Sequence, residues 1–470
     1  MARRNRNKLF KNLKVVDTGQ KGKAVAKTED GQVVFVDNAI PGDVVDVQTY
    51  KKRRRFYQGR PVSFVKESPF RTQPKCEHFG TCGGCKWQNM DYDKQLEFKQ
   101  KSVVDNLLKI GHLDLPEVTP IKASDDIYYY RNKMEFSFSN NRWLTQEEID
   151  SGVDYKHKNA LGFHIPGMWD KILDLNNCYL QQDPSNAIRN SIKKFAIEND
   201  LSFFDVRKQE GLLRTLMIRT TTVGDVMVLI QFYEDDVAKR ELLLNYIKAT
   251  FPEITSLQYV INQKANDTIY DQEVVCYHGQ DYITEKMEDL EFRIDAKSFY
   301  QTNSDQAYEL YKIAREYADL KASDVVYDLY TGTGTIAQFV ARQVKKVVGI
   351  EAVPEAIEKA KTNAQHNGIS NCIFTVGDMK KVFTDEFIKE HGQPDVVITD
   401  PPRDGMHKDV VGTLLKLRAK RIVYVSCNSA TQARDLEMLK DAYTITKVRP
   451  VDMFPQTHHV ENVVCLELKS

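Results

Sequence analysis

Apolar strand-like runs alternate with helical patterns over residues 291–470, and this alternation restricts the possible folds more than any other feature of the chain. Such a pattern is typical of a doubly wound, mostly parallel sheet, which binds ligands at the ends of its strands. The preceding residues mix short strands and helices without this regularity. The sequence therefore predicts a multidomain protein whose last part is a Rossmann-like α/β domain.

A glycine-containing loop follows the first predicted strand of this domain, Val325–Tyr330. Gly332 and Gly334 allow the backbone to turn tightly and to approach a ligand closely. A dinucleotide-binding loop usually carries a third glycine where the helix opens onto a pyrophosphate, whereas this helix opens with Ile336. S-adenosylmethionine (SAM) has no pyrophosphate, so the loop favours SAM over a dinucleotide.

Acidic residues end the next three predicted strands. Glu351 closes the second strand and is suited to hydrogen-bond the two hydroxyls of a ribose. Asp378 follows the third strand, where it can meet an adenine amino group, and Asp400 ends the fourth strand before Pro-Pro-Arg403. Methyltransferases acting on amino groups commonly complete a similar motif with an aromatic residue. Arg403 in that place disfavours adenine as the target base.

A cysteine and a carboxylate offer covalent chemistry at the same edge of the predicted sheet. Cys427 ends the fifth predicted strand, which begins at Arg421, and Glu461 heads a final strand expected to return beside it. A thiolate that adds to carbon 6 of uracil makes carbon 5 nucleophilic toward a sulfonium methyl group, and a base must then remove the carbon-5 proton. Cys427 is the predicted nucleophile and Glu461 the predicted base, with His458 and His459 as alternative bases or RNA contacts.

The charge of the chain is strongly asymmetric. Residues 1–66 contain 16 Lys and Arg against 6 Asp and Glu, a balance of +10, although the whole chain is formally neutral. The positive charge is concentrated in Arg3–Lys8 and Lys51–Arg55, and short β-rich runs between turn signals fill Leu13–Val65. These features predict an OB-like β-barrel over residues 1–66 that binds a polyanion, RNA or DNA.

Three of the eight cysteines are clustered. Cys76, Cys82 and Cys85 have spacings of five and two residues and predict a metal site, although the spacing cannot choose between zinc and an iron–sulfur cluster. No apolar stretch is long enough to cross a bilayer, and the basic N-terminus has no apolar run behind it. We therefore expect a cytoplasmic protein with no membrane association and no obligate protein partner.

Together these motifs resemble the RNA uracil-5-methyltransferase family, specifically its iron–sulfur branch that acts on large-subunit (23S) ribosomal RNA. The resemblance extends over nearly the whole chain and includes a TRAM-like barrel at the N-terminus. The other segments that carry it are Cys76–Cys85, Tyr130–Phe136, Phe299–Asn303, Asp328–Gly334, Asp400–Arg403, Ser426–Asn428 and His459–Glu461.

The resemblance implies a role for each matching position. Cys427 would be the nucleophile and Glu461 the base, and Cys178 would join the three clustered cysteines as the fourth ligand of a [4Fe–4S] cluster. Thr335 is a weaker match at a cofactor-side position. The residues implied to contact SAM are Gln301, Tyr330, Glu351, Asp378 and Asp400.

The resemblance also implies a domain order and a substrate. Residues 1–66 would form the RNA-binding TRAM barrel, 67–290 an α+β central domain with the iron–sulfur cluster, and 291–470 the methyltransferase domain. The tRNA-acting branch typically lacks both barrel and cysteine cluster, so their presence favours 23S ribosomal RNA.

Three alternatives remain open at this point. A cytosine-5 RNA methyltransferase uses the same thiol addition, but it usually carries a second cysteine after the proline of the fourth-strand motif, where this chain has Arg403. A non-catalytic RNA-binding or assembly factor would leave Cys427 without a purpose. A redox-sensing iron–sulfur protein would leave the SAM motifs unexplained.

Overall fold

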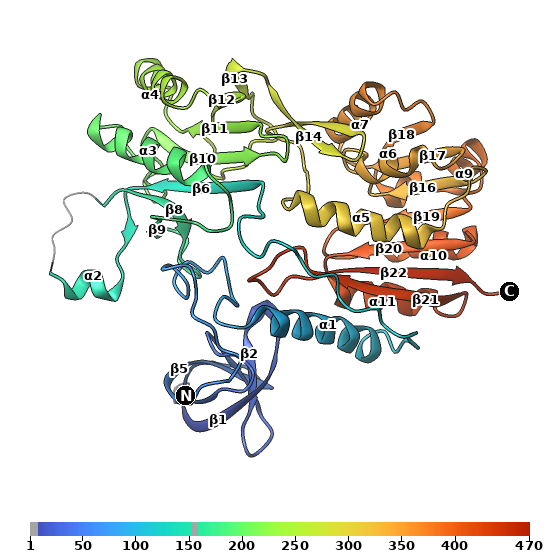
Figure 1. Ribbon diagram of the computed structural model, residues 1–470, viewed down its shortest axis with the longest axis horizontal. Helices are drawn as coiled ribbons and strands as arrows, with labels where there is room; N and C mark the ends of the chain where they lie inside the picture. Colours follow the sequence, from blue (N-terminus) through green and yellow to red (C-terminus); the bar gives the residue numbers. More distant parts are fainter. Residues whose placement is uncertain (1–7, 153–157) are drawn as a thin grey trace. The chain divides into compact units, whose positions relative to one another are not determined.

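The computed structural model describes residues 8–152 and 158–470 and divides the chain into two compact units (Figure 1). The first unit comprises residues up to Ile127 together with Lys312–Asp319 and Asp395–Ser470. The second comprises Tyr128–Tyr311 and Leu320–Pro394. Each unit is thus built from segments that are distant in the sequence.

A closed five-stranded barrel forms the N-terminal part of the first unit, with strand order β1-β2-β3-β5-β4. Alternate residues point inward, as the period of a strand requires, so small and branched apolar side chains such as Ala26, Val34 and Val45 are fully buried. This confirms the predicted barrel. Its strands are β1 (Leu9–Thr18), β2 (Ala24–Lys27), β3 (Val33–Val36), β4 (Val44–Lys52) and β5 (Phe56–Lys66).

The segment after the barrel is fastened to it by a buried carboxylate. Asp43 is fully buried and accepts two hydrogen bonds from Arg71, at 2.8 Å from Nε and 2.6 Å from Nη2. The backbone N–H of Ser68 donates to the same carboxylate at 2.9 Å. The chain then passes through the three clustered cysteines and enters helix α1 (Tyr92–Lys109).

The C-terminal strands of the first unit have the order β19-β20-β22-β21. β19 and β20 are parallel, whereas β22 is antiparallel to both β20 and β21. Nearly every residue of β20 and β22 is buried, which explains their continuous apolar sequence. The elements are β19 (Val396–Thr399), α10 (Lys408–Leu417), β20 (Arg421–Ser426), α11 (Ser429–Leu439), β21 (Tyr443–Val451) and β22 (Glu461–Leu468).

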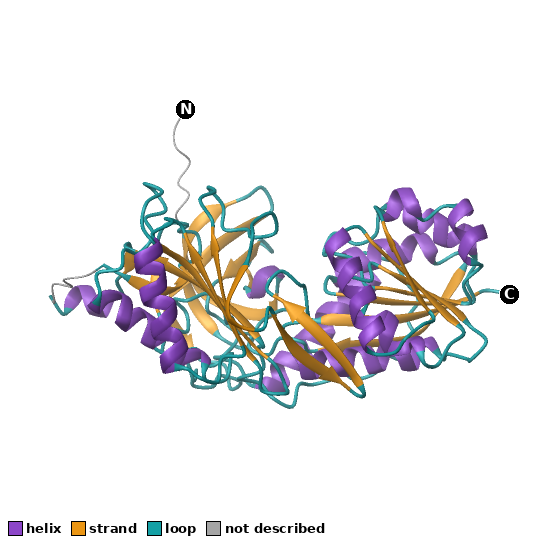
Figure 2. Ribbon diagram, turned by 90° about the horizontal axis from the view of Figure 1, so that it is seen from above, coloured by secondary structure: helices purple, strands orange, loops and turns teal. Residues whose placement is uncertain are grey.

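An eight-stranded, twisted sheet of order β13-β12-β11-β10-β6-β8-β9-β7 forms the larger part of the second unit (Figure 2). Helices α3 (Ser185–Glu198) and α4 (Val237–Thr250) pack together through stacked rings of Phe195 and Tyr246, and α2 (Gln146–Asp150) is short. The strands are β6 (Lys133–Ser139), β7 (Arg142–Trp143), β8 (Ala160–His164), β9 (Ile172–Asp174), β10 (Leu213–Thr220), β11 (Val226–Phe232), β12 (Ser256–Ile261) and β13 (Val275–Gly279).

The remaining strands of the second unit are an antiparallel pair, β14 and β15, and three parallel strands of order β18-β17-β16. Helix α5 (Ser304–Ala318) runs from residues of the second unit into residues of the first. The elements are β14 (Tyr282–Met287), β15 (Leu290–Asp295), β16 (Val325–Leu329), α6 (Thr335–Ala341), β17 (Lys346–Glu351), α7 (Pro354–His366), β18 (Cys372–Val376), α8 (Met379–Val382) and α9 (Asp385–His391).

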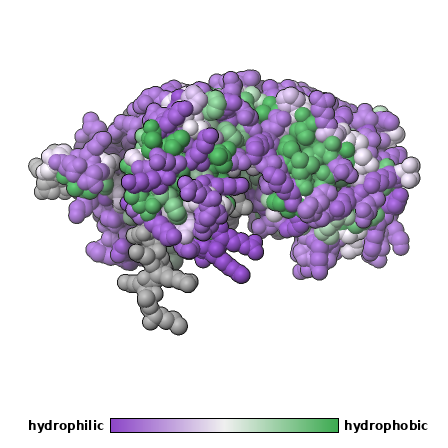
Figure 3. All heavy atoms as spheres, turned by 90° about the horizontal axis from the view of Figure 1, so that it is seen from below, coloured by the Kyte–Doolittle hydropathy of each residue, from purple (hydrophilic) through white to green (hydrophobic). Residues whose placement is uncertain are grey.

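In the face shown in Figure 3, hydrophobic side chains gather in separate patches among hydrophilic ones. Within residues 8–152 and 158–470, no helix is both long enough and apolar enough to span a bilayer.

Candidate active site

The structure places Cys427 and Glu461 at the same end of two adjacent strands. Ser426, the last residue of β20, pairs with Asn462 of β22, so Cys427 immediately follows β20 where Glu461 begins β22 (Figure 1). The final strand therefore does return beside the strand that precedes Cys427, as the sequence predicts. Buried hydrogen bonds from Gln432 Nε2 to Tyr424 O (2.9 Å) and from Asn462 Nδ2 to Gln432 Oε1 (2.8 Å) hold this end of the strands.

The environment of Glu461 favours its protonated form. Its side chain is buried, and burial followed by repulsion from Asp400 raises its pKa to about 8, while Arg403 opposes the rise. The pKa of the partly buried Cys427 thiol rises to about 11 through burial and through the carboxylates of Glu461 and Asp400, again against Arg403. Cys427 and Glu461 thus lie at the same end of two adjacent strands, and the pKa of each is strongly raised, in part by a neighbouring carboxylate. Such a pair of groups is a candidate for catalysis.

His458, three residues before Glu461, differs from it in basicity. Burial and the neighbouring His459, Lys99 and Lys86 lower the pKa of His458 to about 3, so His458 is neutral near pH 7. Its Nδ1 atom is buried without a hydrogen-bond partner among the described residues. A group this weakly basic is poorly matched to removing a proton at neutral pH, which favours Glu461 over His458 as the base.

The loop after β16 has the conformation expected of a ligand-binding turn. Tyr330, Gly332 and Gly334 all adopt positive φ values, of 64°, 56° and 75°. A Cβ at Gly332 would meet no atom within 4 Å, whereas one at Gly334 would lie 2.9 Å from Ala360 Cβ. Gly334 thus allows close packing, Gly332 borders open space, and the left-handed Tyr330 is the kind of backbone outlier that clusters at functional sites.

Glu351 is held at the end of β17 beside this loop. Its Oε2 accepts from the N–H of Gly332 at 3.2 Å, and its Oε1 accepts from the N–H groups of Ala352 and Val353 at 2.8 and 3.0 Å. These bonds fix a carboxylate next to the open space at Gly332, which suits a ribose with two hydroxyls.

The other predicted cofactor residues are less constrained. Asp378 is exposed and caps α8 by accepting from the N–H of Lys380 at 3.0 Å. The backbone carbonyl of Gln301 accepts from Asn132 Nδ2 at 2.8 Å, which orders the segment Phe299–Asn303. Gln301, Tyr330, Glu351 and Asp378 belong to the second unit, whereas Asp400, Cys427 and Glu461 belong to the first.

Asp328, in the segment Asp328–Gly334, is a further candidate residue that the sequence alone does not single out. It is the second-last residue of the buried strand β16, and burial raises its pKa to about 7 despite a hydrogen bond from Thr331. The backbone N–H of Ala337 also lowers this pKa, so Asp328 is a buried carboxyl group at the strand end that precedes the glycine loop.

The predicted metal ligands lie on separate segments. Cys76, Cys82 and Cys85 are partly buried in the loop before α1, Cys178 is partly buried after β9, and all four are free of disulfide bonds. Burial raises the pKa of the Cys178 thiol. Within the described ranges no three His, Cys, Asp or Glu side chains are arranged to hold a metal. The metal site therefore stays a prediction.

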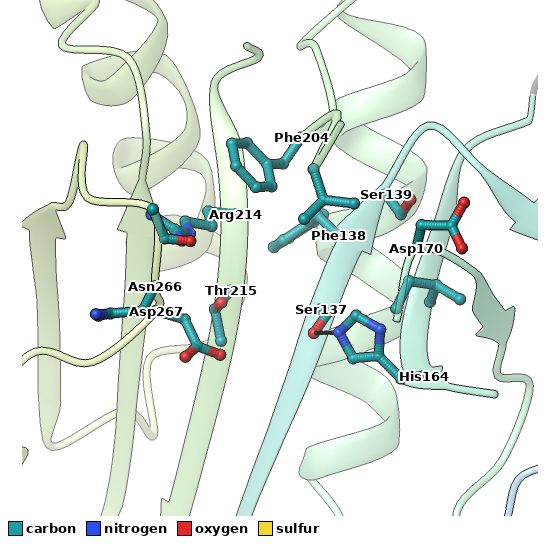
Figure 4. A pocket seen from close by; sticks show the side chains of 13 residues that line it. Ser137, Phe138, Ser139, His164, Asp170, Phe204, Arg214, Thr215, Asn266 and Asp267 are labelled. Atoms are coloured by element: carbon teal, nitrogen blue, oxygen red, sulfur yellow. Dashed lines mark hydrogen bonds between the residues drawn. The ribbon is translucent and has the colours of Figure 1, made fainter. Parts of the chain in front are cut away.

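A small pocket of about 200 Å³ lies on the eight-stranded sheet, and none of the predicted site residues lines it (Figure 4). Phe138, Phe204 and Arg214 line it together with His164, whose Nε2 lies 3.4 Å from Ser137 Oγ. The Arg214 guanidinium donates to the carbonyl groups of Asn262, Lys264 and Ala265 and stacks over Phe204. Because Arg214 already donates to three backbone carbonyl groups, its role is structural.

Parallel strands, a glycine loop after the first of them and a carboxylate at the end of the next are features of a Rossmann-like fold, which binds dinucleotides or SAM. A family of tRNA (uracil-5-)-methyltransferases matches residues 269–469, and the TRAM domain matches residues 11–62. The chain belongs to the RNA uracil-5-methyltransferase family and carries a TRAM domain. This confirms the predicted family and disfavours the cytosine-5 alternative.

Relatives cover almost the whole chain. It is 55% identical over 453 residues to an uncharacterized RNA methyltransferase of Bacteroides thetaiotaomicron, with 95% of this chain and 99% of the relative covered. It is 43% identical over 462 residues to one of Chlorobaculum tepidum, with 97% and 95% covered. The crystal structure of Pyrococcus abyssi tRNA (uracil-54, C5)-methyltransferase with S-adenosyl-L-homocysteine is similar with a TM-score of 0.75 and 28% identity, covering 97% of this chain and 100% of that one.

Proposed function

We propose that this protein methylates carbon 5 of a uridine in structured RNA, using SAM as the methyl donor. The observation that carries the proposal is the meeting of Cys427 and Glu461 at one end of β20 and β22, in a chain of the uracil-5-methyltransferase family. The family match spans residues 269–469 and so includes segments of both units. We therefore propose that Cys427 and Glu461 act on a base that receives its methyl group from SAM held by the cofactor residues.

Cys427 begins the proposed reaction as a thiolate that adds to carbon 6 of the uracil ring. The new sulfur–carbon bond pushes an electron pair toward carbon 5, which can then attack an electrophilic methyl group. Glu461 next removes the proton from carbon 5, and the electron pair of that carbon–hydrogen bond forms the 5,6 double bond as the thiolate leaves. Arg403 opposes the rise in the pKa values of Cys427 and Glu461, and so favours the ionised form of each.

SAM, when bound, supplies the electrophilic methyl group. Glu351 is proposed to hold the ribose hydroxyls, Asp378 the adenine amino group, and Gln301, Tyr330 and Asp400 the remaining contacts. Support comes from the open space at Gly332 beside the Glu351 carboxylate. The similar P. abyssi enzyme was crystallised with S-adenosyl-L-homocysteine, the demethylated form of this donor.

The proposed substrate is 23S ribosomal RNA, with tRNA as the second candidate. The similarity to a tRNA (uracil-54, C5)-methyltransferase covers 97% of this chain, including the barrel. The barrel alone therefore does not discriminate between the two RNAs. Mapping 5-methyluridine in ribosomal RNA and tRNA from cells with and without the gene tests both candidates. Loss of the modification from 23S RNA supports the first, loss from tRNA supports the second, and loss from neither contradicts the proposed activity.

The basic run Lys51–Arg55 at the end of β4 is proposed to bind RNA phosphates. Replacing its five residues with glutamine should weaken RNA binding about tenfold or more at physiological salt, because fewer counterions are then released from the RNA on binding. The slope of log affinity against log salt should fall by about 0.7–0.9 for each phosphate that is no longer neutralised. Filter-binding titrations at several salt concentrations measure both quantities, and Lys420→Gln, at a highly exposed lysine elsewhere in the first unit, is the control. An unchanged slope contradicts this role.

Cys76, Cys82, Cys85 and Cys178 are proposed to hold a [4Fe–4S] cluster that orders the segments around them. The proposal rests on the spacing of the three clustered cysteines and on the soft donor character of thiolates, which suits iron–sulfur or zinc. Protein purified without oxygen should contain about four iron and four sulfide ions per chain, as expected for this cluster type. Cys82→Ser should lose the iron, whereas Cys276→Ser, at an exposed cysteine of β13, should keep it. Bound zinc in place of iron contradicts the cluster.

A further inference from the structure

The loop that leads into Glu461 is itself held by buried polar groups. Val451 and Glu461 pair where β21 and β22 meet, so residues 452–460 form a hairpin loop that ends at Glu461. Asp452 and Gln456 in this loop are 0% and 2% exposed. Several of the side chains that form hydrogen bonds with them belong to helix α1.

Lys99 of α1 forms a fully buried ion pair with Asp452. Lys99 Nζ lies 2.5 Å from Asp452 Oδ1, and neither side chain has any exposed surface. The same ammonium group donates to the carbonyl of Phe454 at 3.1 Å, and the Tyr92 hydroxyl donates to Asp452 Oδ2 at 3.0 Å. The start of the loop is thus fixed to α1 by a charge pair and two further hydrogen bonds.

Gln95, one helical turn before Lys99, forms two reciprocal hydrogen bonds with Gln456. Gln95 Nε2 donates to Gln456 Oε1, and the Gln456 N–H donates to Gln95 Oε1, both at 3.0 Å. Gln95 Nε2 also donates to the carbonyl groups of Trp87 and Met90. A buried hydrogen-bond network of this kind favours one arrangement of the groups it joins.

Gln456 also connects the loop to the cysteine segment and the barrel. Its backbone is left-handed, with φ of 66°, and its carbonyl accepts from the N–H groups of Lys86 and Trp87 at 2.8 and 3.1 Å. These two residues directly follow Cys85, and Trp87 Nε1 donates to the carbonyl of Gly22 in the barrel at 3.1 Å. The loop is therefore joined to α1 and to the cysteine segment, and through Trp87 to the barrel.

We infer that Gln95 and Lys99 are positioning residues for Glu461. Through the hydrogen bonds of the Gln456 carbonyl with Lys86 and Trp87, proton removal also depends on the order of the adjoining cysteine segment, residues 76–85. This inference rests on the proposed function, because it takes Glu461 as the base. A base must lie within hydrogen-bond reach of the proton it removes, and a displacement of about 1 Å can cost about 10²-fold in rate. Gln95 and Lys99 act on the step that releases the product and not on the addition of Cys427.

Single-turnover kinetics of the full-length protein with substrate RNA test the inference by separating covalent adduct formation from adduct release. Gln95→Met keeps the side-chain length but removes both hydrogen bonds to Gln456, together with those to the Trp87 and Met90 carbonyl groups. Release should slow about tenfold or more, as expected for a misplaced base, while adduct formation and SAM affinity stay within about twofold. Lys109→Met is the control, since Lys109 is a highly exposed residue at the end of the same helix.

A second variant, Lys99→Met with Asp452→Asn, removes both buried charges together and so leaves neither one unpaired. It provides the test if Gln95→Met does not fold, as judged by thermal unfolding. Selective slowing of release in a folded variant supports the inference. Release at the wild-type rate, or an equal loss of formation, release and SAM binding, overturns it. If the wild-type protein forms no adduct, the proposed function itself is wrong. This outcome differs from failure of the inference alone, in which the wild-type protein still forms and releases the adduct.

Discussion

Replacing Cys427 with alanine will reduce methyl transfer to RNA by about 10⁴-fold or more, because removal of a covalent nucleophile from an enzyme typically costs this much. SAM affinity should change by less than about twofold, since Gln301, Tyr330 and Glu351 are untouched. Transfer of tritiated methyl groups to RNA measures the first quantity, and titration calorimetry with SAM measures the second.

Cys276→Ala provides the matched control for this substitution. Cys276 lies in β13 with an exposed side chain, and nothing in the reaction requires it. Its replacement should leave methyl transfer unchanged. Undiminished transfer by Cys427→Ala would remove the thiol from the mechanism, and absence of transfer by the unmodified protein would favour a non-catalytic RNA-binding factor.

Replacing Glu461 with glutamine will accumulate a covalent protein–RNA adduct and reduce turnover by about 10²–10⁴-fold, the usual effect of losing a general base. The thiol can still add to the ring and carbon 5 can still be methylated, but the carbon-5 proton stays in place. Denaturing gel electrophoresis with labelled RNA detects the adduct as a slower-migrating band. Rapid turnover without an adduct in this variant would assign the base to another residue.

The pKa of Glu461 also predicts a pH dependence. Burial and Asp400 raise this pKa to about 8, so the fraction of ionised base increases as the pH rises from about 6 toward 8. The rate of adduct release should therefore increase with pH over this range and level off above it. The increase should disappear in Glu461→Gln, whose amide does not titrate. A release rate that is flat with pH in the unmodified protein contradicts an ionisable base with this pKa.

The regular elements could be predicted well because their signals are local. The predicted strand Lys346–Glu351 coincides with β17, and the helix predicted to start near Tyr92 begins there. The strand predicted to run from Arg421 to Cys427 corresponds to β20, which ends one residue earlier, at Ser426. Continuous apolar runs that end in a single polar residue specify buried parallel strands and their ends together. The barrel was predictable for the same reason, from short alternating strands between turn residues.

The buried contacts that hold the candidate site in place could not be predicted, because they join segments that are distant in the sequence. Lys99 and Asp452 are 353 residues apart, and nothing in the helical pattern around Lys99 marks it as a buried residue. The raised pKa of Glu461 and the lowered pKa of His458 arise from burial, which the sequence does not reveal. Sequence motifs therefore identify reactive groups, whereas their ionisation follows from the fold.

Trapping with RNA that contains 5-fluorouridine tests the covalent mechanism most directly. Fluorine at carbon 5 replaces the proton that Glu461 removes, so the adduct cannot collapse after methylation. Digestion and mass spectrometry should find the peptide containing Cys427 carrying a methylated fluorouridine nucleotide, and only when SAM is present. Efficient methylation of ordinary RNA together with no nucleotide attached to Cys427 would contradict the account.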